Sequence, residues 1–327
     1  MRLYLALLES SAPDQTRIFA DVDDHLIDLR LAYATYLTRV QNTRVNAYDL
    51  AACYFPPNLA AFLERGAAAM NELQATVSFV RQSGAEEMRG PAGERIAYDS
   101  RELRLLPPLR HPEKSIVIGF ADRARVEALP KAEIPTGFYK LPQTFITAGA
   151  PILWPKFAAE LDADGCLAIV IGKPGKRIAP ENAWNHVAGA TLMIDITARD
   201  INKREGLTTN NLLGKNFPTS TCLGPALLSA NSQADLTALE IALSLDGEVR
   251  QKFTLGDCVF SVEEMIARWS TLGVKPGDWL AIGATMALAG DQLQHPVALK
   301  IGATLTCSSP ALGALAHRIT TPGERLR

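Results

Sequence analysis

The chain has 327 residues, 47% of them hydrophobic and 21% charged, and its formal net charge is −2. This length suffices for one large domain with a smaller one beside it. A nearly neutral chain gives no electrostatic support to nucleic-acid binding, and its apolar runs are too short to span a membrane. The five cysteines are scattered without a Cys-x-x-Cys pair, which suits a reducing cytoplasm. We therefore expect a cytoplasmic protein with no nucleic-acid or membrane partner.

The first part of the chain, residues 1–110, is predicted to be a small α+β domain. Four elements are predicted in it: strands at Leu3–Leu8 and Arg17–Val22, and helices at Leu29–Arg39 and Leu59–Met70. Prolines 107, 108 and 112 then mark a boundary. The rest of the chain, residues 111–327, is predicted to form the larger domain.

Two apolar runs in the larger domain hold polar residues that need an explanation. Cys166–Ile171 is a continuous apolar run that ends at Gly172, which is typical of a buried strand. Ala190–Ile196 repeats the pattern, with Asp195 inside it. A carboxylate inside an apolar strand costs free energy unless a cation or hydrogen bonds compensate it. Asp195 is therefore the first candidate for a functional residue.

Further elements are predicted on both sides of these two strands. They are strands at Ser115–Phe120, Leu239–Leu245, Gln251–Leu255, Trp279–Ile282 and Val297–Ala303, and an amphipathic helix at Ser261–Ser270. Between two of the strands, Asp246-Gly247 is a two-residue signal typical of a β-hairpin turn. The larger domain is thus expected to consist mostly of strands.

Four segments resemble the C-terminal catalytic domain of the fumarylacetoacetate hydrolase superfamily. They are GATLMIDITARD at 189–200, LGKNF at 213–217, DGEVRQ at 246–251 and KPGDWLAIG at 275–283. LGKNF corresponds to a family pattern G-K-s-F, in which serine commonly follows the lysine. The resemblance implies an α+β fold, with a mixed β-sandwich or rolled β-barrel as the catalytic domain. It also implies a homodimer.

The resemblance further implies a divalent metal site, for Mg²⁺ or Mn²⁺, held by three carboxylates. The positions that align with those ligands here are Asp164, Cys166 and Asp195. Period-two alternation places residues 164 and 166 on one face of a strand. A thiol that is normally protonated is a poor ligand for Mg²⁺. We therefore expect metal binding at this site to be weak.

A lid segment in the family carries a His and a Glu that activate water. Here Arg123 and Val126 stand at the aligned positions, and Glu127 follows one place later. An arginine cannot accept a proton at neutral pH, so Arg123 cannot replace the histidine as general base. Glu127 is the remaining candidate for acid–base chemistry, with Arg123 near it in the sequence. This role requires a reshaped lid that brings Glu127 toward the substrate.

Two cations of the family pattern are retained at Lys215 and Arg199. The resemblance assigns the catalytic ammonium of Lys215 to an enolate oxygen and the guanidinium of Arg199 to a substrate carboxylate. A guanidinium can hold a carboxylate through two hydrogen bonds, and a buried ammonium suits an oxyanion. Alternatively, both cations form only structural ion pairs, with Asp195 and Asp200.

Three more residues are candidates for contact with the substrate. Lys140 lies in a segment similar to the family's F-x-K, next to Tyr139. Asn202 follows Arg199 in the same segment. An exposed lysine is the alternative interpretation of Lys140.

The resemblance implies an enzyme that acts on a small 1,3-dicarbonyl compound or 2-oxo acid through an enolate. C–C bond hydrolysis, decarboxylation and tautomerisation all belong to this chemistry. Loss of the water-activating dyad weakens hydrolysis but leaves enolate stabilisation intact, because preorganised cations can supply it. A metal-independent cyclase or isomerase is therefore one alternative. A non-catalytic pseudoenzyme subunit is the other.

Overall fold

The computed structural model describes residues 1–8, 16–43, 45–119, 134–205, 212–229, 233–283 and 298–323. Its strands are β1 Arg2–Leu8, β2 Arg17–Val22, β3 His25–Asp28, β4 Ala97–Tyr98, β5 Leu103–Leu106, β6 Ser115–Ile118, β7 Gly137–Tyr139, β8 Phe145–Ile146, β9 Ile152–Leu153, β10 Leu161–Ile171, β11 Val187–Ala198, β12 Thr221–Ser229, β13 Ile241–Leu245, β14 Glu248–Phe253, β15 Trp279–Ile282, β16 Thr304–Ser309 and β17 Gly313–Thr320. Its helices are α1 Leu29–Arg39, α2 Ala47–Tyr54, α3 Leu59–Glu64, α4 Gly66–Ser83, α6 Arg199–Arg204, α7 Gln233–Thr237 and α8 Val262–Trp269, with short 3₁₀ turns between elements.

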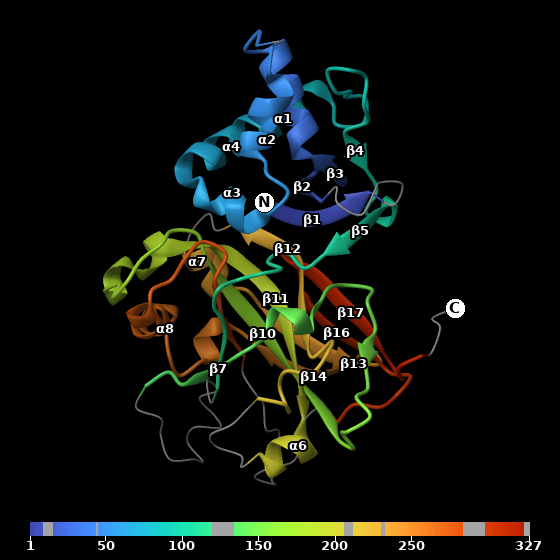
Figure 1. The fold of residues 1–327 in the computed structure, drawn as a ribbon, viewed down its shortest axis with the longest axis vertical. Helices are drawn as coiled ribbons and strands as arrows, with labels where there is room; N and C mark the ends of the chain where they lie inside the picture. Colours follow the sequence, from blue (N-terminus) through green and yellow to red (C-terminus); the bar gives the residue numbers. More distant parts are fainter. Residues whose placement is uncertain are drawn as a thin grey trace.

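Twelve strands form one sheet that runs through both parts of the chain (Figure 1). Its order is β4-β3-β2-β1-β12-β11-β10-β15-β6-β7, with β5 paired to β1 and β8 paired to β12. A second sheet has the order β14-β13-β16-β17-β9. The described strands leave both sheets open, without a closed barrel. This confirms the α+β fold that the sequence predicts.

Helices α1 to α4 gather at one end of the molecule, beside the N-terminal strands (upper part of Figure 1). Helix α1 begins where the carboxylate of Asp28 accepts a hydrogen bond from the backbone N–H of Leu31. The helix predicted at Leu59–Met70 is instead two helices, because Gly66 has a φ of +60° and breaks the helical path between them. Among the described residues, no helix combines the length and the apolar composition needed to cross a membrane.

The two faces of strand β10 pack against different parts of the protein. Leu167 and Ile169 belong to the core beneath the second sheet. Cys166 and Ala168 point the other way and share a core with Phe62 of helix α3. Since side chains alternate along a strand, residues 164 and 166 lie on the same face. The polar end of that face holds the candidate site.

Two predictions for the C-terminal part have opposite outcomes. The hairpin at Asp246-Gly247 is confirmed: both residues have positive φ, of 51° and 84°, and they connect β13 to β14. The strand predicted at Val297–Ala303 is wrong over its described residues, 298–303, which form no strand. Gly302 turns the chain there with a φ of +90°, so the strand begins only at Thr304.

Candidate active site

Asp195 lies on β11 between two lysines, which explains how a carboxylate is tolerated inside an apolar strand. Lys140 Nζ donates a hydrogen bond to one carboxylate oxygen over 2.8 Å, and Lys215 Nζ donates to the other over 2.5 Å. Asp195 is only 2% exposed. Burial by itself would raise the pKa of Asp195, but the two ammonium groups hold it below its ordinary value. Asp195 is therefore a permanently ionised centre.

Lys140 is enclosed completely by protein acceptors. Besides Asp195, its ammonium donates to the backbone carbonyl of Lys215 and to that of Ser220, 3.2 Å away. An ammonium has three N–H groups, so these contacts occupy all of them. Burial lowers the pKa of Lys140 despite the opposing effect of Asp195. The structure thus places Lys140 beneath the site, without room for direct contact with a ligand.

Lys215 has a more open position than Lys140. Its ammonium donates to Asp195 and, over 2.6 Å, to the hydroxyl of Thr197. The same ammonium lies 4.9 Å from the centre of the Phe138 ring, within the range of a cation–π contact. Among the described residues, no acceptor takes its third N–H. Lys215 can therefore donate a hydrogen bond to a bound oxyanion.

Arg199 begins helix α6 directly after strand β11, and its guanidinium reaches back to two carboxylates. Its Nε donates to Asp162 over 2.7 Å, and its Nη2 lies 3.5 Å from Asp164. Asp162 is buried, whereas the side chains of Asp164 and Arg199 remain 14% and 17% exposed. Arg199 is thus oriented by carboxylates while part of its guanidinium stays accessible.

Asp164 is the carboxylate that the surroundings satisfy least. Its Oδ1 atom is buried without a hydrogen-bond partner among the described residues. Burial raises the pKa of Asp164, and the negative charge of Asp162 adds to this effect, although Arg199 opposes it. A raised pKa makes a carboxylate a stronger base than usual, and Oδ1 of Asp164 is an acceptor that the described residues leave open.

The three positions that align with the family's metal ligands fit a hard divalent ion poorly. Both oxygens of Asp195 are occupied by lysines. Cys166 is 2% exposed, and burial raises the pKa of its thiol well above the ordinary value, so it stays protonated. Within the part of the chain that the structure describes, no group of three or more His, Cys, Asp or Glu side chains is placed to hold a metal ion. We therefore assign no catalytic step to a metal ion at these three positions.

Two of the predicted substrate-binding residues occupy different places from Lys215 and Arg199. Tyr139 is 43% exposed, and its ring packs edge-on against Trp269 rather than toward Lys215. Asn202 is buried on α6 against Gly214, where a Cβ would meet its Oδ1 atom at 2.1 Å. The side chains of Tyr139 and Asn202 therefore take no part in the hydrogen bonds that the described residues make with Asp195. Residues Arg123, Val126 and Glu127 lie outside the described residues.

The structure also brings in residues that the sequence interpretation missed. They are Phe138, Asp162, Thr197, Asn216 and Ser220. Two of them had a signal in the spacing: Thr197 lies two residues after Asp195, and Asp162 lies two before Asp164, so alternation places each pair on one face. The other three are close in the chain to the site lysines: Phe138 lies two residues before Lys140, Asn216 follows Lys215, and Ser220 lies five residues after Lys215.

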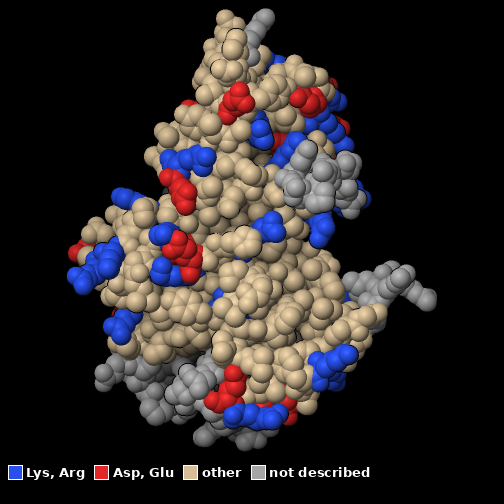
Figure 2. All heavy atoms as spheres, viewed as in Figure 1, with Lys and Arg blue, Asp and Glu red and all other residues tan. Residues whose placement is uncertain are grey.

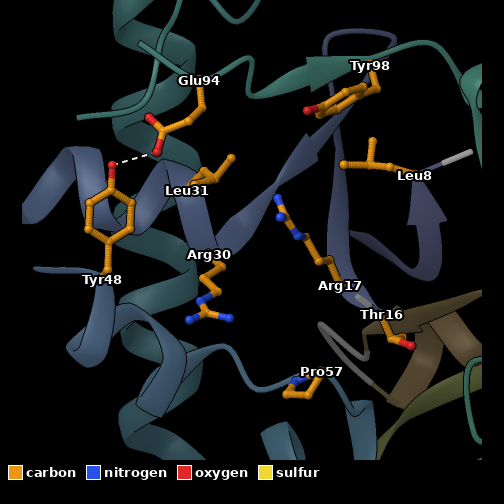
Figure 3. A pocket seen from close by; sticks show the side chains of 9 residues that line it. All are labelled: Leu8, Thr16, Arg17, Arg30, Leu31, Tyr48, Pro57, Glu94 and Tyr98. Atoms are coloured by element: carbon orange, nitrogen blue, oxygen red, sulfur yellow. Dashed lines mark hydrogen bonds between the residues drawn. The ribbon is translucent and has the colours of Figure 1, made fainter. Parts of the chain in front are cut away.

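A separate hollow of about 510 Å³ lies in the N-terminal part (Figure 3). Arg17 and Arg30 extend along it, and Tyr48 donates a hydrogen bond to Glu94 over 2.6 Å (dashed line in Figure 3). The guanidinium of Arg17 is paired with the buried carboxylate of Asp28. Because Arg17, Tyr48 and Glu94 already have partners, and none of the lining residues belongs to the lysine site, we assign the hollow no ligand.

The candidate site thus consists of a carboxylate bridged by two lysines, with an arginine beside it. The sequence profile of the fumarylacetoacetate (FAA) hydrolase C-terminal domain matches residues 116–320. A solved structure with a similar fold is fumarylacetoacetate hydrolase from Exiguobacterium antarcticum, with a TM-score of 0.72 and 21% identity, covering 98% of this chain and 99% of the other.

Two curated relatives share more of the sequence. Oxaloacetate tautomerase FAHD2A, mitochondrial, from Bos taurus is 34% identical over 269 residues, which cover 81% of this chain and 80% of the relative. Oxaloacetate tautomerase YisK from Bacillus subtilis is 33% identical over 231 residues, which cover 68% and 75%. The chain therefore belongs to the fumarylacetoacetate hydrolase family.

Proposed function

We propose that this protein catalyses the keto–enol tautomerisation of a small 2-oxo acid, with dicarboxylates such as oxaloacetate as the substrate class. The observation that carries this proposal is the ammonium of Lys215, fixed by Asp195 and Thr197 with one N–H left for an oxyanion. Relatives that are 31–34% identical and are named oxaloacetate tautomerases support it. On the face seen in Figure 2, basic and acidic side chains are interspersed; the cations that we assign to the selection of an anionic substrate lie inside the site.

We assign one residue to each step of the proposed reaction. Arg199 holds a substrate carboxylate through the part of its guanidinium that remains accessible. The free oxygen of Asp164 accepts a proton from C3, and the C–H electron pair forms the C2–C3 double bond. The carbonyl oxygen becomes an enolate oxygen, which Lys215 stabilises. Return of the proton to that oxygen gives the enol, and the reverse sequence gives the keto acid.

The cations contribute mainly by electrostatic stabilisation of the enolate. Fixed donors directed at a developing oxyanion contribute about 3 kcal/mol each in enzymes where one has been removed. Lys215 is already oriented before the substrate binds, so little reorganisation is needed. Lys140 stabilises this arrangement, because its ammonium donates a hydrogen bond to the other oxygen of Asp195.

The test is an assay of oxaloacetate tautomerisation that follows the ultraviolet absorbance of the enol. The protein should accelerate the interconversion above the buffer rate, and Lys215→Met should abolish most of the acceleration. Pyruvate is measured in the same samples, because decarboxylation through the same enolate would release it. The proposal fails if the unmodified protein leaves the tautomerisation rate unchanged. Binding of oxaloacetate without turnover would instead favour the non-catalytic alternative.

A further inference from the structure

Asn216 spans the backbone on both sides of Lys140. Its Oδ1 atom accepts a hydrogen bond from the backbone N–H of Leu141 over 2.6 Å, and its Nδ2 donates to the carbonyl of Tyr139 over 3.0 Å. On the opposite side, the backbone N–H of Lys140 donates to the carbonyl of Ser115 over 2.8 Å. The main chain at Lys140 is thus held from two directions.

This arrangement replaces a missing neighbour strand. Strand β7 ends the described order of the large sheet, with β6 as its partner on one side. The outward N–H and C=O groups beside Lys140 would otherwise have no strand to bond with. One carboxamide supplies both an acceptor and a donor, as an adjacent strand would. Asn216 therefore fixes the position of the Lys140 backbone at the edge of the sheet.

The same short segment also fixes the other end of Lys140. The carbonyl of Lys215, the residue before Asn216, accepts a hydrogen bond from the Lys140 ammonium. The side chain of Lys215 meanwhile bonds to Asp195. Residues 215 and 216 are therefore in contact with the backbone of Lys140, with its ammonium and with Asp195.

We propose that Asn216 is a positioning residue that sets the ammonium of Lys140 against Asp195, and through Asp195 sets the direction of Lys215. Its expected effect on turnover rests on the proposed tautomerase function, but the positioning itself does not. A serine, common at this place in the G-K-s-F pattern, has a single short hydroxyl and cannot reach both backbone groups. The two-sided contact is thus a property of the asparagine in this chain.

The kinetic test compares Asn216→Ser with two other variants. Asn216→Ser should lower kcat about tenfold, since it removes the two hydrogen bonds that hold the backbone on either side of Lys140. KM should stay within about twofold of the parent value, because Arg199 and its contacts are untouched. Asn216→Asp keeps the acceptor for Leu141 and should lose less kcat. Asn58→Ser is the matched control: Asn58 accepts two backbone hydrogen bonds at the start of α3, a serine can cap the helix in the same way, and kcat should not change.

A second measurement needs no substrate. In protein labelled with ¹³C at the lysine Cε atoms, the Lys140 signal, assigned with Lys140→Arg, should move in Asn216→Ser and stay in place in Asn58→Ser. If the unmodified protein has no tautomerase activity, the proposed function fails while this signal still tests the positioning. An unmoved Lys140 signal in folded Asn216→Ser overturns the positioning role. A change in KM with kcat intact contradicts it as well.

Discussion

Asp164 lies directly opposite Asp195 across the ladder between β10 and β11. The two carboxylates share one face of the sheet, yet their surroundings change their pKa values in opposite directions. Burial raises the pKa of Asp164, whereas Lys140 and Lys215 overcome burial and lower that of Asp195. Two neighbouring carboxylates with opposite shifts are a common way to divide acid–base and electrostatic roles. This difference supports the proposed roles: proton transfer at Asp164 and a fixed negative charge at Asp195.

Replacement of Lys215 by methionine should reduce turnover far more than binding. The methionine keeps most of the side-chain volume but cannot donate to the enolate oxygen, which exists only after proton removal. We expect kcat to fall about a hundredfold or more, with a small change in KM, in the enol absorbance assay. Lys203→Met is the control, because Lys203 makes only an exposed ion pair with Glu160. Equal turnover of the Lys215 variant and its parent would remove Lys215 from the mechanism.

Replacement of Arg199 by lysine should weaken binding first. A lysine keeps the charge but loses the planar set of donors that can hold one carboxylate while contacting Asp162. We expect KM to rise about tenfold to a hundredfold, which is the effect of losing one charge-assisted contact. Arg204→Lys, on the exposed side of the same helix, should leave KM unchanged. A variant of Arg199 with parental KM would contradict the assignment of the substrate carboxylate to this residue.

Magnesium should bind the unmodified protein weakly. Calorimetry at low micromolar Mg²⁺ should give no saturable heat, because the donor set offers a protonated thiol at Cys166 and an Asp195 already paired with lysines. The double variant Cys166→Glu with Asp164→Glu restores two carboxylates and should raise the affinity. Its folding must be checked by circular dichroism, since the backbone of Gly283 lies close to the Cys166 sulfur. Tight binding of Mg²⁺ by the unmodified protein would refute the argument that the Cys166 thiol weakens the site.

The candidate site shows what strand periodicity can predict and what it cannot. Alternation correctly predicts that Asp164 and Cys166 share one face, because both residues lie on the same strand. The same rule already conflicts with the expectation that Tyr139 and Lys140 both face the substrate, since neighbours on a strand point to opposite faces. The burial of Lys140 depends on Ser220 and Lys215, which are 75–80 residues away in the chain. Contacts over such separations arise from the packing of whole elements, and no local pattern encodes them.

The fold was predictable where local signals are strong. Helix α1 has the bounds predicted from its sequence, and the Asp246-Gly247 turn is where its residue types place it. The strand expected at Val297–Ala303 was wrong because apolar content alone does not reveal the turn at Gly302. The extension of one sheet from β4 to β7 could not be predicted, because pairing between β1 and β12 joins residues more than 220 positions apart.

His317 should make the protein less stable in mild acid. Its side chain is buried on β17, its Nδ1 donates to the carbonyl of Ala150, and burial lowers its pKa from 6.5 to about 4. In the unfolded chain, His317 therefore binds a proton below pH 6.5, whereas in the folded protein it stays neutral down to about pH 4. The contribution of His317 to the free energy of unfolding is complete above pH 6.5 and falls by about 3 kcal/mol as the pH drops to about 4.

The measurement is urea unfolding of the parent and of His317→Gln at several pH values between 7 and 4. Glutamine can still donate to Ala150 but does not titrate, so its free energy of unfolding should change less steeply with pH. Other groups titrate in both proteins and cancel in the comparison. Identical slopes for the two proteins would show that His317 is not the group responsible.

The pairing of β1 with β12 has a consequence for any attempt to shorten this protein. Arg2 and Leu3 bond along the outer edge of β12, at Leu227 and Leu228. Removal of residues 1–110 would strip that edge and uncover the apolar face of β10 that packs on Phe62. An unpaired apolar strand edge is a template for association with other chains. A fragment starting near residue 111 should therefore accumulate as insoluble aggregate during expression, even though every residue of the lysine site would still be present.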